Sequence, residues 1–328
     1  MKPRIWSSGS YSGALGARVE SLAPGTFWAT HSSSGPVQAI YDYWQYFYRS
    51  KIGLQGMPKN CSKDFSAIID YVDGVFLHGS RKQKADLKRL FGLQGVRHGD
   101  DAAAAISAPI WAWQSIQLYS GYSTFYQMCD AIEGVSPNTT LAESSKDGVG
   151  LKKALPNYAK GYTTSYLPVC RPTVFSRLAN AQYYQRQCGL FFPRQGPYTY
   201  ASNRGKTAAA LNAHTKGRHL YDTKRLMWVN GEFDPWRSAS TASVFRTGGP
   251  LPSTPRTPSI VIPGARHCND LRASNAVNED VKKTQEAVIK QMAEWTNEFY
   301  GPGRGRRPFA SDGHDSEIER GVTWSRLV

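Results

Sequence analysis

Three residues of this 328-residue chain could together carry out nucleophilic catalysis: Ser10, Asp234 and His267. Hydrolysis of an acyl bond by a serine requires a base that takes the hydroxyl proton and an acid that orients the base. Ser10 lies among small residues, in the segment 9–13, directly before a stretch predicted to be helical. Small neighbours are typical of a nucleophile elbow, a strained strand-to-helix turn in which larger side chains would clash.

Asp234 and His267 each follow a short apolar run that predicts a β-strand. The run 225–229 ends at an Asn-Gly turn before Asp234, and the run 259–262 ends before His267. Loops at the carboxyl ends of parallel strands are where α/β folds hold their sites. Each residue alone also suits an ordinary role in a turn, a cap or the surface. Their order, Ser then Asp then His, favours the catalytic interpretation.

Other titratable residues are weaker candidates. His31 lies near a predicted core strand, but nothing in the sequence positions it as a base. Asp270 follows His267 by three residues and could cap the next helix or act as a second carboxylate. Asp234 is the better candidate for the acid that orients the base, because it follows a predicted strand that is separate from the one before His267. We expect structural roles for the histidines in helical or loop stretches: His78, His98, His214, His219 and His314.

The elements that must position these residues form two core-like ends around a helical middle. Residues 1–58 hold the elbow and its helix, and residues 222–300 hold the two later strands and a final amphipathic helix. Between them, residues 59–221 show helical spacing and few strand signals. The pattern predicts a doubly wound α/β sheet with an inserted helical cap. The tail, 301–328, has little to pack and is predicted to be disordered.

Two details of the first core segment are also predicted. The apolar stretch 26–30 indicates a strand that the following serines, glycine and proline interrupt. The aromatic stretch 40–47 indicates a helix. In the final segment, the apolar face of the helix predicted over about 276–300 should pack on the sheet.

The net charge of +15 raises the question of nucleic-acid binding. The basic residues are scattered, and no recognition motif accompanies them, so a basic surface without that role is favoured. The sequence contains no run of eighteen apolar residues, so no membrane span is predicted. The amino-terminal residues show no signal-peptide segment. Neither a cofactor nor a metal is expected, because the cysteines form no CxxC pair.

Cysteines and glycosylation sequons favour an oxidising, secretory compartment. Sequons occur at Asn60 and Asn138. The odd number of cysteines leaves at least one without a partner, and their pairing stays open. The five are Cys61, Cys129, Cys170, Cys188 and Cys268.

At these motifs the chain resembles the proline-directed serine peptidases, the family of lysosomal Pro-Xaa carboxypeptidase, a related dipeptidyl peptidase and fungal acid prolyl endopeptidase. The fungal branch is the most similar, and the resemblance covers roughly residues 3–300. The Asp-Pro-Trp-Arg block at 234–237 and the His-Cys-x-Asp-Leu block at 267–271 are its most specific parts. The motifs that carry it are 9–15, 23–29, 60–64, 230–237 and 262–271.

The resemblance implies an α/β-hydrolase core, with an inserted helical cap, that cleaves peptides at proline. It implies that Ser10 is the nucleophile, Asp234 the orienting acid and His267 the general base. The backbone N–H of Tyr11 would be an oxyanion-hole donor. It also implies an extracellular or vacuolar/lysosomal location. The type of cleavage (endo-, carboxy- or dipeptidyl-peptidase) and the oligomeric state stay open.

Three departures from the family pattern bear on activity. Ser8 stands where the family usually has glycine two residues before the nucleophile. The family's segment before the elbow, with the first strands of the sheet, is absent, so the core is expected to be incomplete. A deletion near 171–175 is expected in the cap. An impaired remnant of the family, an esterase on the same core and, least favoured, a nucleic-acid binder are the alternatives.

Overall fold

The computed structural model describes residues 2–47, 56–135, 147–166, 178, 181–220 and 222–301, and every structural statement below refers to these ranges. Several sequence predictions lie outside them. These are the sequon at Asn138, Cys170, the expected deletion near 171–175 and the tail from 302 onward.

A four-stranded parallel sheet forms the centre of the described fold. Its order follows the chain: β1 (Ile5–Gly9), β2 (Ala29–Ser33), β3 (Leu226–Gly231) and β4 (Ser259–Ile262). The strands β2 and β3 are adjacent although nearly two hundred residues separate them in the sequence. All four carboxyl ends therefore lie at one edge of the sheet, where Ser10, Asp234 and His267 follow.

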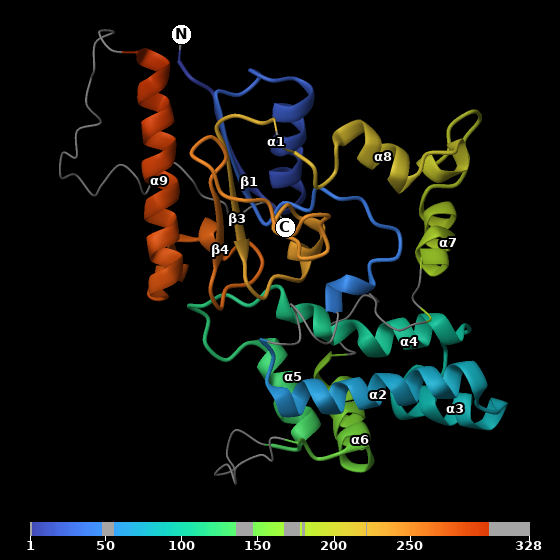
Figure 1. Ribbon diagram of the computed structural model, residues 1–328. Coiled ribbons are helices and arrows are strands. Elements are labelled where there is room, and N and C mark those ends of the chain that lie inside the picture. The colour runs from blue at the N-terminus through green and yellow to red at the C-terminus, as the bar shows by residue number, and fades with distance from the viewer. Residues whose placement is uncertain are drawn as a thin grey trace.

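Helices cover both faces of this sheet (Figure 1). Helix α1 (Ser10–Leu22) packs on one face and α9 (Glu279–Tyr300) on the other. Because successive strand residues point to opposite faces, Trp228 of β3 packs in the apolar cluster with α1, while Val229 packs in the cluster with α9. The described core is thus a three-layer α/β structure, as the sequence predicts.

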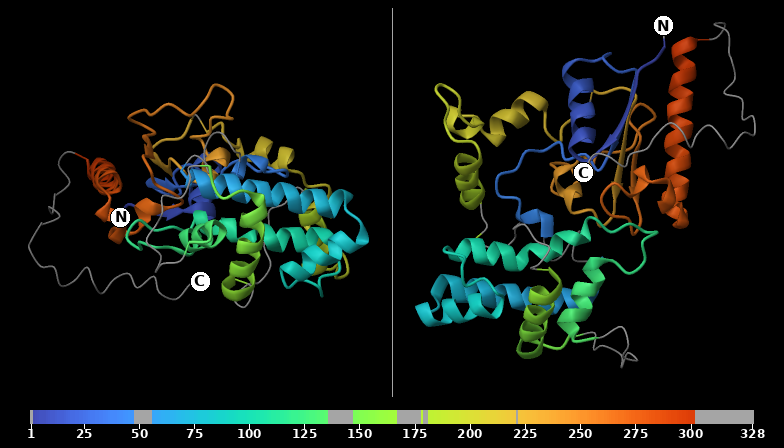
Figure 2. Two further views of the ribbon diagram at one scale, coloured as in Figure 1. Left: turned by 90° about the horizontal axis from the view of Figure 1, so that it is seen from below. Right: turned by 180° about the vertical axis from the view of Figure 1, so that it is seen from behind.

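A group of helices with its own apolar core lies beyond the carboxyl ends of the strands (Figures 1 and 2). A disulfide between Cys61 and Cys129 joins α2 to α5. Cys188 and Cys268 are free. The helices of this group are α2 (Lys59–His78), α3 (Arg81–Leu90), α4 (Gly99–Ser107), α5 (Thr124–Glu133) and α6 (Leu151–Gly161).

Two later helices run beside this group and back to the core. Helix α7 is Ala181–Phe191 and α8 is Ala208–Thr215. Asn212 of α8 exchanges two hydrogen bonds of 2.8 Å with the backbone of Ala39, so α8 is attached to the first core segment. Short helical turns complete the described fold: Trp44–Phe47, Ala108–Trp113, Tyr162–Tyr166, Ala201–Arg204, Pro235–Ala239, Asn269–Leu271 and Ala273–Val277.

The structure corrects two predicted elements. Strand β2 covers 29–33 and continues through Ser32 and Ser33, which were expected to break it, because β1 and β3 pair with it on both sides and Ser33 Oγ donates to Asp270 in the loop after β4. The helix predicted over 40–47 is wrong for its first half, and only a short turn at Trp44–Phe47 forms. Aromatic residues have modest helix propensity, and here Tyr43 and Tyr46 pack against the ring of Trp236 instead. Of the described helices, none combines the length and the apolar character that a bilayer crossing requires.

Candidate active site

Ser10 occupies the turn between β1 and α1 and has a backbone φ of +55°. This left-handed conformation is costly for a residue with a side chain and is characteristic of a nucleophile elbow. The space around the turn explains its small residues. A Cβ on Gly9 would lie 2.5 Å from Leu271 Cδ1, and one on Gly13 would lie 3.0 Å from the carbonyl oxygens of Ser8 and Ser33.

Asp234 follows β3 and is completely buried. Its Oδ1 accepts a hydrogen bond of 3.0 Å from the backbone N–H of Trp236, which caps the short turn at Pro235–Ala239. A cap is one of the ordinary, non-catalytic roles that the sequence suggests for Asp234. The capping interaction also fixes the direction of the carboxylate, which leaves both oxygens within reach of a second partner.

That second partner is His267, which follows β4. Its Nδ1 lies 3.1 Å from both Oδ1 and Oδ2 of Asp234. Burial alone would lower the pKa of His267, but the charge of Asp234 and the hydrogen bond to it raise the pKa above its ordinary value. Because a carboxylate can only accept, Nδ1 carries a proton, and Nε2 of the neutral ring is left as the basic atom. The His267 side chain is 14% exposed, so this ring reaches solvent while Asp234 does not.

The loop of His267 lies against the elbow. A Cβ on Gly9 would be 2.7 Å from Cys268 Sγ, so the residue before Ser10 touches the residue after His267. Within the described ranges Ser10 makes no side-chain hydrogen bond. The packing of the elbow on the loop of His267 brings the two residues near each other without a hydrogen bond between them. Catalytic hydrogen bonds are often long in a ligand-free enzyme and tighten when substrate binds.

Two further sequence predictions can be located. Tyr11 is the second residue of α1, and a backbone N–H in the first turn of a helix has no acceptor within that helix. Its phenol ring is 64% exposed and plays no part in the site. Asn60 lies in the first turn of α2, half-buried, with its amide near the carboxyl group of Glu133.

Sequence reasoning missed an aromatic wall beside His267. The ring centroid of Trp236 is 6.3 Å from that of His267, and Tyr46 lies 5.0 Å from Trp236. The amide oxygen of Gln114 accepts a hydrogen bond of 2.7 Å from Trp236 Nε1 and another from the Tyr46 hydroxyl. Burial and the charge of Asp234 raise the pKa of Tyr46, so the phenol stays neutral. The aromatic run at 40–47 was the available signal.

The helices beyond the sheet contact the loops that carry Asp234 and His267. Trp113 Nε1 donates a hydrogen bond of 3.1 Å to the carbonyl of Phe233, the residue before Asp234. The guanidinium of Arg266, the residue before His267, lies 4.4 Å from the Trp113 ring centroid and donates to the hydroxyl of Tyr126 at 3.2 Å. One tryptophan therefore touches the neighbours of both residues of the Asp–His pair.

The sequence also gave no sign of a second histidine–aspartate pair below the site. His31 Nδ1 hydrogen bonds with Ser7 Oγ at 3.0 Å, and its Nε2 lies 3.2 Å from Asp270 Oδ2. Asp270 Oδ1 accepts a hydrogen bond of 2.5 Å from Ser33. Asp270 is thus engaged by β2, and of these two aspartates Asp234 is the one that contacts His267.

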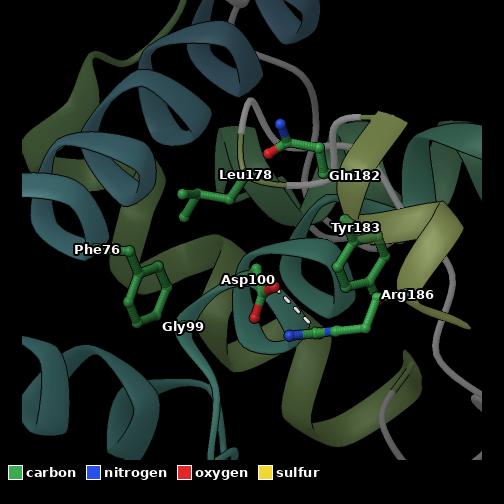
Figure 3. Close-up of a pocket in the computed structure, with 7 residues that line it drawn as sticks. All are labelled: Phe76, Gly99, Asp100, Leu178, Gln182, Tyr183 and Arg186. Carbon is green, nitrogen blue, oxygen red and sulfur yellow. Dashed lines mark ion pairs between the residues drawn. The ribbon is translucent and has the colours of Figure 1, made fainter. Parts of the chain in front are cut away.

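A separate cavity of about 400 Å³ opens between α4 and α7 (Figure 3). Arg186 crosses it to form an ion pair of 3.0 Å with Asp100. None of its lining residues belongs to the Asp–His pair or the elbow. The lining consists of Phe76, Gly99, Asp100, Leu178, Gln182, Tyr183 and Arg186. Across the described ranges, no group of three or more histidine, cysteine or acidic side chains is arranged to hold a metal ion.

Comparison with known proteins adds family evidence to this geometry. The sequence profile of the family described as serine carboxypeptidase S28 matches residues 1–135 and 161–288. The chain is 36% identical to the serine protease vicPa of Bipolaris victoriae over 356 residues, which cover 91% of this chain and 66% of that protein.

Two shorter matches point the same way. A probable extracellular serine carboxypeptidase of Arthroderma benhamiae is 39% identical over 131 residues, covering 39% of this chain and 18% of that protein. The lysosomal Pro-X carboxypeptidase of Bos taurus is 32% identical over 85 residues, covering 26% of this chain and 15% of its own length. The chain spans 66% of the length of the Bipolaris victoriae protease vicPa, which it matches over 91% of its own residues.

Proposed function

The chain belongs to the serine carboxypeptidase S28 family, and from that membership and the site geometry we propose that it is a serine-type peptidase. Ser10 is the nucleophile, His267 the general base and Asp234 the acid that orients the base. One observation carries the assignment: His267 Nδ1 lies 3.1 Å from both carboxylate oxygens of Asp234, in a loop packed against the elbow of Ser10.

The proposed reaction proceeds through an acyl-enzyme. Ser10 Oγ attacks the carbonyl carbon of the scissile bond while His267 Nε2 takes its proton. The oxyanion that forms accepts a hydrogen bond from the N–H of Tyr11, at the start of α1, where the helix dipole also favours negative charge. The carbon–nitrogen bond then breaks, and His267 returns the proton to the leaving amine. Water then attacks the acyl carbon while His267 takes its proton. The bond to Ser10 Oγ breaks, and His267 returns the proton to Ser10.

Cleavage at proline is the proposed specificity. Trp236, with Tyr46 and Trp111 packed behind it in tilted and edge-on contacts, places apolar rings beside His267, and such surroundings suit a rigid apolar ring better than a charged side chain. The name of the bovine relative, a Pro-X carboxypeptidase, agrees with this substrate class. Proline-containing peptides are therefore the proposed substrates.

The proposal extends to the architecture and location. The parallel sheet with α1 and α9, and the helices beyond its carboxyl edge, fit an α/β-hydrolase core with an inserted helical cap. An extracellular or vacuolar/lysosomal location is supported by the names of the fungal and bovine relatives. The disulfide between Cys61 and Cys129 fits such an oxidising compartment.

A fluorophosphonate probe tests the catalytic assignment. We expect covalent labelling of Ser10 in folded wild-type protein and none in Ser10→Ala. Absence of labelling in folded wild type would contradict the proposal and identify an impaired member of the family. Turnover of a prolyl peptide amide should accompany labelling, whereas turnover of simple esters alone would make the protein an esterase on the same core.

A further inference from the structure

The second histidine of the core, His31, sits at a junction between the sheet and the loop of the catalytic base. In the β1–β2 register, Ser7 is opposite His31 and Gly9 is opposite Ser33. Because side chains alternate along a strand, His31 and Ser33 point to the same face of β2. Ala29, on that same face, packs in the apolar cluster with α9, so this face looks toward α9 and the loop after β4.

The carboxylate of Asp270 occupies that face. Asp270 lies 3.2 Å from His31 Nε2 through one oxygen and accepts the 2.5 Å hydrogen bond from Ser33 through the other. The side chains of His31 and Asp270 are each 3% exposed. Gln285 of α9 donates to the Asp270 carbonyl at 3.0 Å, which closes the remaining side. Asp270 is therefore held by β2 through its carboxylate and by α9 through its backbone carbonyl.

Asp270 in turn determines the course of the loop that carries His267. Only Cys268 and Asn269 separate the two residues, and Cys268 has a left-handed φ of +55°. A residue with a side chain keeps such a conformation only where its surroundings enforce it. The Cys268 backbone N–H donates to Ser34 Oγ at 3.0 Å, so β2 holds the loop at two adjacent points.

We propose that His31 is a positioning residue for the catalytic base. Through Asp270, it holds the loop after β4 against the carboxyl ends of β1 and β2, and this places His267 over Ser10. The proposal rests on the catalytic roles assigned above. His31 itself touches no reacting atom: its Nδ1 hydrogen bonds with Ser7 and its Nε2 lies 3.2 Å from Asp270, below the elbow.

The chemistry of the pair explains why an apolar side chain would not serve. A buried carboxylate needs compensating partners, and loss of one leaves an unpaired charge that the protein avoids by local rearrangement. In His31→Ala, the Asp270 carboxylate keeps Ser33 but loses its imidazole neighbour. We expect Asp270 to turn toward water and to draw the adjacent loop with it. A displacement of about 1 Å at a catalytic group can cost on the order of 100-fold in rate.

The experiment compares the rate of fluorophosphonate labelling per folded molecule in three variants. We expect His31→Ala to slow labelling by about 10- to 100-fold. His31→Gln, which offers an amide N–H to Asp270, should recover the rate to within a few fold. The matched control is Leu226→Ala, a buried position at the opposite end of β3, which should lower the melting temperature without changing the rate per folded molecule.

Steady-state kinetics on a prolyl peptide separate positioning from general destabilisation. Positioning predicts a lower kcat in His31→Ala with KM within about twofold, because binding groups stay in place. If His31→Ala does not fold, Ser33→Ala, which removes the other donor to Asp270, replaces it with the same expected direction. Wild-type labelling with unchanged rates in His31→Ala and Ser33→Ala overturns this inference, whereas unlabelled wild type overturns the proposed function instead.

Discussion

Two serine–histidine–aspartate arrays lie next to each other in the core, and only one has the features of a catalytic site. Ser7, His31 and Asp270 form the inner array, and Ser10, His267 and Asp234 the outer one. The inner histidine is 3% exposed and the outer one 14%. Their serines also differ, since Ser7 lies within β1 and Ser10 lies in the left-handed turn after it.

The comparison shows that residue type alone does not make a nucleophile. Ser7 lies within β1, in the strand paired to β2, and not at the N-terminus of a helix. Ser10 lies at the start of α1, where N–H groups of the first turn and the helix dipole could receive an oxyanion. We therefore propose that the inner array contributes position and the outer array contributes the nucleophile and its base.

Replacement of the two serines should give the largest difference between the arrays. Ser10→Ala should abolish labelling and lower kcat by about 10⁴-fold or more, because no other group can form the acyl-enzyme. Ser7→Ala should keep labelling within about threefold of wild type, since His31 retains Asp270. Mass spectrometry of the labelled peptide and kcat on a prolyl amide are the measurements. Labelling that persists in Ser10→Ala would reverse the roles given to the two arrays.

Replacement of the outer carboxylate should separate orientation from charge. Asp234→Asn should lower kcat by about 10⁴-fold, because an amide can stabilise the wrong imidazole tautomer. The Asp234 charge raises the pKa of His267 against the effect of burial, so its removal should lower that pKa. The acid limb of the pH–labelling profile should then move to lower pH. A limb that stays in place would show that Asp234 does not control His267.

The inner carboxylate should have a smaller effect with a different signature. We expect Asp270→Asn to slow labelling by about tenfold, because the His31 contact weakens while the Ser33 hydrogen bond remains. The acid limb should stay where it is, since Asp234 still faces His267. A pH–labelling profile of Asp270→Asn that shifts like that of Asp234→Asn would show that the two arrays titrate together.

The smallest expected effect lies at Glu133, at the end of α5 in the helical group, and concerns stability. Burial and the neighbouring Asp64 raise the pKa of Glu133 to about 7, above its ordinary 4.5. The stabilisation from its protonated form is complete below pH 4.5 and is lost as pH rises through about 7. The melting temperature should therefore fall between pH 5 and pH 8 by roughly 2–4 °C more in wild type than in Glu133→Gln.

Labelling is the control for this variant, and Glu133→Gln should be labelled at the wild-type rate. A changed rate would mean that the cap carboxyl pair acts on the outer array. An equal pH dependence of melting in the two proteins would contradict the role given to Glu133.

Much of the core could be predicted from the sequence, because strand ends are local features. The positions of β3, β4 and α9 follow from apolar runs and helical spacing, and they place Asp234 and His267 at one edge. The inner array could not be predicted. It depends on the register that sets Ser7 opposite His31, and on a loop some 240 residues later that brings Asp270 to the same face. No local pattern records such a contact.

The aromatic wall could not be predicted, for a related reason. The run at 40–47 has the composition of a helix face, but its rings are used against Trp236, nearly two hundred residues away. Tertiary packing decided the backbone there.

The contact of Trp113 with both catalytic loops has a consequence for how substrate entry and chemistry are related. Trp113 donates to the residue before Asp234 and stacks under the residue before His267, while its own chain segment leads out of α4. A shift of the helices beyond the carboxyl edge of the sheet would therefore be transmitted to the loops that carry Asp234 and His267. Substitutions in these helices that change peptide recognition would then change turnover as well.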